Sequence, residues 1–139
     1  AVLDKCVATL CDFAQVREGL LFVSSAGITR VYRESFPAPI GVMLALVLEM
    51  SPVEAANANK IKVRVEDADG QKLAEMVGEV QVKLGSGHDP GELVNVPFVA
   101  DFRAMKLPSP GRYQVAIHPE VDGANPVALG FRAAVRNKT

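Results

Sequence analysis

The chain has 139 residues, of which 49% are hydrophobic and 22% are charged, and 15 basic against 16 acidic residues give a net charge of -1. This composition is typical of one globular domain and excludes a disordered, collagen-like or coiled-coil chain. The near-neutral net charge does not indicate nucleic-acid binding. No apolar run reaches the roughly 18 residues that span a membrane. We therefore predict a single domain over residues 1–139 with no nucleic-acid and no membrane partner.

The two cysteines, Cys6 and Cys11, lie near the N-terminus. In a strand, five steps would separate their Cα atoms by about 16 Å and point the side chains to opposite faces. A disulfide needs a Cα separation within about 7 Å, and two cysteines supply too few ligands for zinc. Free thiols are typical of a reducing compartment. Because no signal peptide is visible either, we expect a cytoplasmic protein.

The N-terminal third has an irregular pattern. Residues 6–13 are predicted to form one strand, and residues 20–24 and 28–33 a pair of strands around Gly27. Four polar residues lie between the first two apolar segments: Asp12, Gln15, Arg17 and Glu18. They could form a recognition site, or they could hydrogen-bond the backbone of that connection. We favour the structural role, and we name these four as the candidate binding residues should the segment bind a ligand.

Residues 42–48 form a continuous apolar run, which flanking prolines keep short enough to favour a strand. Only one face of a strand meets the core of a two-layer sandwich. The other face must be covered by the N-terminal segment, by the short helix that follows, or by a second copy of the chain. We favour the second copy, in a two-fold dimer.

That short helix is predicted near residues 52–58. Ser51-Pro52-Val53-Glu54 has the pattern of a capping box with proline at the first helical position. No longer helix alternates with strands elsewhere, which excludes a doubly wound α/β fold.

Alternating apolar residues then predict strands at 60–66, from 71 to about 84, and at 94–102, 113–117 and 127–135. Gly70 marks a hairpin, Gly78 is interpreted as a bulge, and Pro97 places its strand at an edge or a bulge. We therefore predict an all-β fold, a single antiparallel sandwich of eight to nine strands with turns about every ten residues.

Two segments carry resemblances to known proteins. Pro110-Gly111-Arg112-Tyr113 and the strands around it resemble the end of an immunoglobulin-like β-sandwich, with Tyr113 placed as in a tyrosine corner. We expect the Tyr113 ring to be buried and its hydroxyl to bond the backbone between residues 105 and 110. Residues 10–23, with Gly27-Ile28-Thr29 and the 67–70 hairpin, resemble a bacterial family of proteins of unknown function. That resemblance implies one β-sandwich over nearly the whole chain and carries no activity.

Two histidines and five aspartates are candidate metal ligands. His88 and His118 have no partner at metal-binding spacing. A calcium site could gather loop carboxylates, but aspartates are also what tight turns use, and we favour the turns. The aspartates in question are Asp67, Asp69, Asp89, Asp101 and Asp122. We predict no metal and no cofactor.

The basic residues of one predicted strand, Lys60, Lys62 and Arg64, could contact phosphates. Cross-strand ion pairs with Glu66, Glu75 and Glu79 explain them more simply.

No nucleophile motif or P-loop is present, so we name no catalytic residues and predict that the chain is not an enzyme. The favoured function is a non-enzymatic interaction or scaffolding module that binds a protein partner. The alternative is a small-molecule-binding or enzymatic protein with a polar cleft near Asp12, Arg17 and Glu18.

Overall fold

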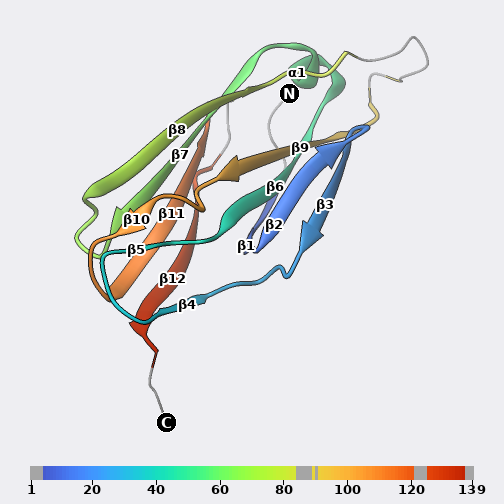
Figure 1. The fold of residues 1–139 in the computed structure, drawn as a ribbon. Coiled ribbons are helices and arrows are strands. Elements are labelled where there is room, and N and C mark those ends of the chain that lie inside the picture. Colours follow the sequence, from blue (N-terminus) through green and yellow to red (C-terminus); the bar gives the residue numbers. More distant parts are fainter. Residues whose placement is uncertain (1–4, 84–88, 90, 121–124, 137–139) are drawn as a thin grey trace.

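The computed structural model describes residues 5–83, 89, 91–120 and 125–136 (Figure 1). This part of the chain is all-β, with twelve strands and one short helix, α1 (Pro52–Ala56). The strands are β1 (Lys5–Cys11), β2 (Phe13–Arg17), β3 (Leu20–Ser24), β4 (Arg30–Arg33), β5 (Ala38–Pro39), β6 (Met43–Met50), β7 (Asn59–Asp67), β8 (Lys72–Val80), β9 (Val94–Asp101), β10 (Lys106–Leu107), β11 (Gly111–Pro119) and β12 (Val127–Val135).

These strands form four sheets rather than the one sandwich of eight to nine strands that was predicted. The two larger sheets have the orders β1-β6-β9 and β4-β12-β11-β7-β8, and β10–β5 and β2–β3 are two-stranded. All neighbours are antiparallel except β12 and β4, which are parallel. The strand number was underestimated because β2, β5 and β10 are only two to five residues long. So few residues give too little alternation to detect.

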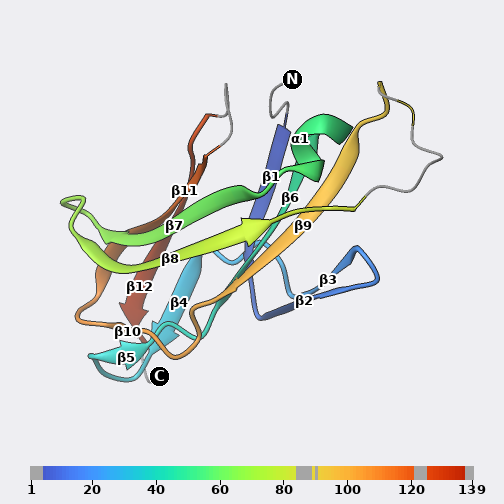
Figure 2. The ribbon, with the colours of Figure 1, turned by 90° about the horizontal axis from the view of Figure 1, so that it is seen from above.

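The core lies between the two larger sheets (Figure 2). Leu44, Leu46 and Leu48 of β6 are fully buried on one side, and Val63 of β7 and Val115 of β11 on the other. The alternation that predicted β7 and β11 therefore identified their buried faces correctly, whereas the continuous apolar run of β6 did not indicate which of its faces meets the core. Pro97 lies on β9, which is an edge strand as expected.

The predicted contact of Tyr113 is confirmed. Its side chain is buried, and its hydroxyl donates a hydrogen bond to the carbonyl oxygen of Ser109. Its ring stacks on the Phe131 ring with the centroids 5.6 Å apart. This pair fixes β11 to its neighbour β12 on the core side of the five-stranded sheet.

The N-terminal third differs most from expectation. The strand β3 pairs with β2, not with residues 28–33, and β4 instead runs parallel to β12. A two-residue turn joins β2 to β3, with positive φ angles at Glu18 (52°) and Gly19 (75°). Such turns match the twist of a hairpin. Because Glu18 is not a usual residue for this backbone conformation, the sequence did not signal the turn.

This hairpin covers part of the outer face of β6. Cys11, Ala14, Met43 and Ala45 form a second buried cluster, against which Leu21 of the hairpin packs. The N-terminal segment thus supplies a local cover, one of the predicted alternatives. The cover is incomplete, because Val47 is only half-buried and its register partner Val7 is 56% exposed.

The short helix begins as predicted. The Ser51 hydroxyl accepts a hydrogen bond from the Glu54 N–H at 3.3 Å, and Pro52 opens the first turn. The helix ends at Ala56, two residues earlier than expected, and Asn59 Nδ2 donates to the Glu54 carbonyl at 2.6 Å. No helix among the described residues is long and apolar enough to cross a membrane.

The interpretation of Gly78 as a bulge was wrong. Gly78 pairs regularly with Ile61, and the irregularity in this hairpin falls between Val65 and Glu66. A Cβ atom at Gly78 would lie 2.3 Å from the Phe98 ring. The glycine therefore makes room for an aromatic side chain from the opposite sheet.

Both cysteines are free, as predicted. Cys6 packs against the main core and Cys11 against the hairpin, so they do point to opposite faces of β1. Burial raises the pKa of both thiols, and the nearby Asp12 carboxylate raises that of Cys11 further.

Candidate functional surfaces

The four candidate binding residues all belong to the hairpin and are all exposed. Asp12 lies at its base, where its N–H donates to the Ser24 carbonyl at 3.1 Å. Gln15 and Arg17 share one face of β2, and Glu18 lies in the turn at the tip. Asp12 and Arg17 are five residues apart, which is about 16 Å along a strand. The structure thus places them along one hairpin and does not gather them at one point.

Three apolar residues that were not among the candidate binding residues, two of them aromatic, are also exposed on the hairpin. The outward face of the hairpin exposes Phe13 (42%), Phe22 (49%) and Leu20 (63%). In the register, Gln15 faces Phe22, and Arg17 faces Leu20. The sequence did contain a signal for this face, because Phe13, Gln15 and Arg17 alternate with the smaller apolar residues Ala14 and Val16. We call this set the hairpin face, made up of Phe13, Gln15, Arg17, Leu20 and Phe22.

Two arginines lie over the two phenylalanines. The Arg17 guanidinium carbon is 6.0 Å from the Phe22 ring centroid, and that of Arg103 is 5.6 Å from the Phe13 centroid. Both distances are typical of cation–π contacts. The hairpin face therefore combines exposed apolar rings with positive charge.

Arg103 is itself held by a carboxylate. Its Nε and Nη2 atoms donate to Asp101 Oδ1 and Oδ2 at 3.0 and 2.9 Å. Hydrogen bonds from the Arg103 side chain and backbone N–H lower the pKa of Asp101. This two-pronged ion pair positions the guanidinium over Phe13.

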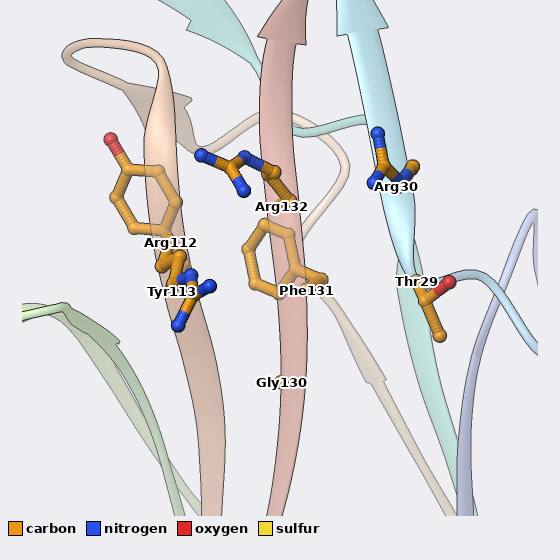
Figure 3. Close-up of a pocket in the computed structure, with 7 residues that line it drawn as sticks. All are labelled: Thr29, Arg30, Arg112, Tyr113, Gly130, Phe131 and Arg132. Atoms are coloured by element: carbon orange, nitrogen blue, oxygen red, sulfur yellow. The ribbon is translucent and has the colours of Figure 1, made fainter.

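A second surface lies on the outer face of the five-stranded sheet. Arg112 of β11 is the register partner of Arg132 of β12, which is in turn the partner of Arg30 of β4. All three side chains are exposed, and they line a shallow hollow of about 350 Å³ (Figure 3). We call these three residues the arginine row. The row was not predicted, because residues 28–33 were expected to pair with residues 20–24 and not with β12.

No carboxylate among the described residues lies within ion-pair distance of the arginine row. On β7 of the same sheet, Arg64 Nε is 3.6 Å from Glu66 Oε2 and 3.5 Å from Glu75 Oε2. Lys60 faces Glu79 in the register. The predicted pairing of cations on β7 with glutamates is thus confirmed for Arg64.

The turn interpretation of Asp67 is confirmed. Its Oδ1 atom accepts hydrogen bonds from the Asp69 N–H at 3.0 Å and the Gln71 N–H at 2.9 Å. Asp122 and His88 lie outside the described residues. Within the described part of the chain, no three metal-ligating side chains gather into a group that could hold an ion.

These observations define an all-β protein with two exposed surfaces, the hairpin face and the arginine row. The chain belongs to the Family of unknown function (DUF6941), whose pattern matches residues 6–134. The predicted membership of a family of unknown function, over nearly the whole chain, is therefore confirmed. No curated protein and no solved structure matches the chain.

Proposed function

We propose that this protein is a non-enzymatic interaction module and that its hairpin face contacts a second copy of the chain. The observation that carries the proposal is the exposure of Phe13, Leu20 and Phe22 on one face of a two-stranded hairpin. Aromatic residues and arginine are the residues most enriched at the centres of protein interfaces. Exposed apolar residues gathered on one element are typical of a contact surface.

The hairpin packs on β6 through Ala14 and Leu21, but it is not part of a larger sheet. Among the described residues, β2 and β3 pair only with each other, and Figure 2 shows the hairpin projecting from the two larger sheets. A two-stranded sheet is marginally stable in water, and its free edges readily pair with another chain. A second copy packed on the hairpin face would bury the exposed rings and hold the two strands in place.

Charge complementarity favours an identical partner in an antiparallel arrangement. The tip of the hairpin carries Arg17 and Glu18, and its base carries Asp12 with Arg103 above Phe13. In a two-fold dimer each patch meets itself. If the two hairpins run in opposite directions, Arg17 faces Asp12 of the second copy, and Glu18 faces Arg103 of the second copy.

The proposal also includes the finer architecture predicted from the sequence, an immunoglobulin-like arrangement of the two larger sheets. Their shared core and the buried Tyr113 corner support it. A reducing, cytoplasmic setting is proposed on the two free cysteines.

Light scattering coupled to size exclusion at micromolar concentration tests the dimer. We expect a mass near twice the 14.8 kDa of the chain for the wild type, and a monomer for Phe22→Asp. Val53→Asp is the matched control, because Val53 is 67% exposed on α1 and outside the hairpin face. Its mass should equal that of the wild type.

A charge exchange tests the antiparallel arrangement. Arg17→Asp should weaken the dimer, and adding Asp12→Arg should restore it, because the two sites face each other across the two-fold axis. A wild type that stays monomeric throughout the concentration range contradicts the proposal.

A further inference from the structure

The arginine row places three like charges side by side. Residues directly opposite each other on neighbouring strands have Cβ atoms about 5 Å apart, so the row spans roughly 10 Å. The register joins Arg112 to Arg132 and Arg132 to Arg30. The three side chains and Thr29 line one hollow. Figure 3 shows the arginines on three neighbouring strands, with the Arg132 side chain extending from β12 toward the strand of Arg112.

This arrangement is unfavourable for the isolated protein. Like charges directly opposite on a sheet are destabilising, and no described carboxylate lies within ion-pair distance of the row. Arg64 and Arg103 have such partners, whereas Arg17 and Arg136, among the described residues, also have no carboxylate within ion-pair distance. The row differs from these in that its three arginines are direct neighbours on adjacent strands. A local conflict of this kind is expected where a surface serves a function.

The floor of the hollow is open at Gly130. A Cβ atom at this position would meet no atom within 4 Å, so the backbone is accessible beside Arg132. Glycine in a strand often marks a place where a ligand approaches the backbone. The hollow of about 350 Å³ is many times the volume of a water molecule, which is about 30 Å³.

The surroundings limit the size of the ligand. The adjacent hollow, which shares Arg112 and Gly130, is lined by Asp67 and Asp69. These carboxylates would repel an extended polyanion, and the net charge of the chain is -1. The positive charge is thus confined to a strip that suits one small anionic group rather than a nucleic-acid backbone.

We propose that the arginine row binds a phosphate monoester group. A guanidinium is planar and donates two parallel hydrogen bonds to a phosphate. A monoester carries a charge of about -1.5 to -2 at neutral pH and three acceptor oxygens. Each of the three arginines can therefore donate to one group, whether that group belongs to a phosphorylated protein side chain or to a small metabolite. This site is separate from the proposed dimer contact.

An NMR titration with phenyl phosphate at constant ionic strength tests the site. We expect shifts of the Gly130 and Thr29 amide resonances, and a loss of affinity of about tenfold or more in Arg132→Gln. Arg136→Gln is the matched control, because Arg136 is exposed just beyond the same strand and does not line the hollow. Its affinity should match that of the wild type.

A second variant keeps the three arginines. Gly130→Glu places a carboxylate in the open floor, where it should neutralise the row and abolish phenyl phosphate binding. If Arg132→Gln and Gly130→Glu both bind as the wild type does, the proposal is wrong. Equal losses in Arg132→Gln and Arg136→Gln would also overturn it, because they would indicate general electrostatic attraction.

Further probes distinguish the source of the phosphate. A phosphoserine peptide that binds more tightly than both phenyl phosphate and its unphosphorylated form supports a protein side chain. Equal affinity for the phosphopeptide, phenyl phosphate and inorganic phosphate supports a small ligand. Tighter binding of a single-stranded oligonucleotide or of polyglutamate would contradict a monoester site.

Discussion

The two halves of the outer face of the five-stranded sheet differ in whether their basic side chains have carboxylate partners. On β7 and β8, Arg64 lies between Glu66 and Glu75, and Lys72 is 3.7 Å from Glu75. On β11, β12 and β4, the arginine row has no described carboxylate within ion-pair distance. Both halves cover the same core, although β12 and β4 are parallel and β7 and β8 are antiparallel. The difference therefore lies in the exposed side chains, and it separates a surface arranged for stability from one that a ligand would complete.

The glycines of the two halves give the largest expected contrast. Gly78 on β8 faces the core against the Phe98 ring, and Gly130 on β12 faces open solvent. Gly78→Ala should lower the free energy of unfolding by about 1–3 kcal/mol, because the added methyl overpacks the core. Gly130→Ala should change it by less than about 0.5 kcal/mol. Urea unfolding of both variants measures the two changes. Equal losses of unfolding free energy would show that the surface around Gly130 is packed as tightly as the core around Gly78.

The tyrosine corner tests whether the arginine row lies on a firmly held strand. Tyr113→Phe removes the hydroxyl that donates to the Ser109 carbonyl. We expect a loss of about 1 kcal/mol, the usual contribution of one such hydrogen bond. Identical thermal midpoints for the wild type and Tyr113→Phe would contradict the corner, and with it a rigid support beneath Arg112.

Removing a charge from the neutralised half should be mildly destabilising. Glu75→Gln breaks the ion pairs to Arg64 and Lys72, and the Glu75 side chain is 29% exposed. We expect a loss of about 0.5 kcal/mol, which added salt should reduce. A gain in stability on Glu75→Gln would show that the ion pairs of β7 and β8 do not stabilise the protein, and would contradict this difference between the two halves.

The pair of Asp101 and Arg103 provides a reference for a partnered arginine. Arg103→Gln should let the pKa of Asp101 rise toward its ordinary value, because the hydrogen bonds that lower it are lost. In the wild type the lowered folded pKa adds stability above the unfolded pKa, and this contribution is lost as the pH falls through the folded pKa. An NMR pH titration of Asp101 measures the change. A pKa that is unaffected by Arg103→Gln would show that the ion pair is absent in solution.

Much of the fold could be predicted from the sequence where alternation was long. The strands β7, β11 and β12 each have nine residues, and their buried faces were predicted correctly. The helix cap at Ser51 and the buried Tyr113 were also identified, because both depend on residues close in sequence. Local patterns carry this kind of information reliably.

The hairpin and the arginine row could not be predicted in the same way. The hairpin has a Glu18-Gly19 turn that is not a strong sequence signal, and its exposed Phe22 resembled a core residue. The arginine row joins Arg30 to Arg132 across about a hundred residues through a parallel pairing. No local pattern specifies a contact over such a distance. The charge-matched hairpin of β7 and β8, by contrast, is joined by a short turn.

The stability of Arg132→Gln, measured by urea unfolding with and without phenyl phosphate, tests the account most directly. Without the ligand, Arg132→Gln should be more stable than the wild type by a few tenths of a kcal/mol, because it removes like-charge repulsion. With the ligand, the wild type should gain stability by mass action and overtake the variant. A variant that is less stable without ligand, or that gains as much from phenyl phosphate as the wild type does, would contradict the assignment of this row to a ligand.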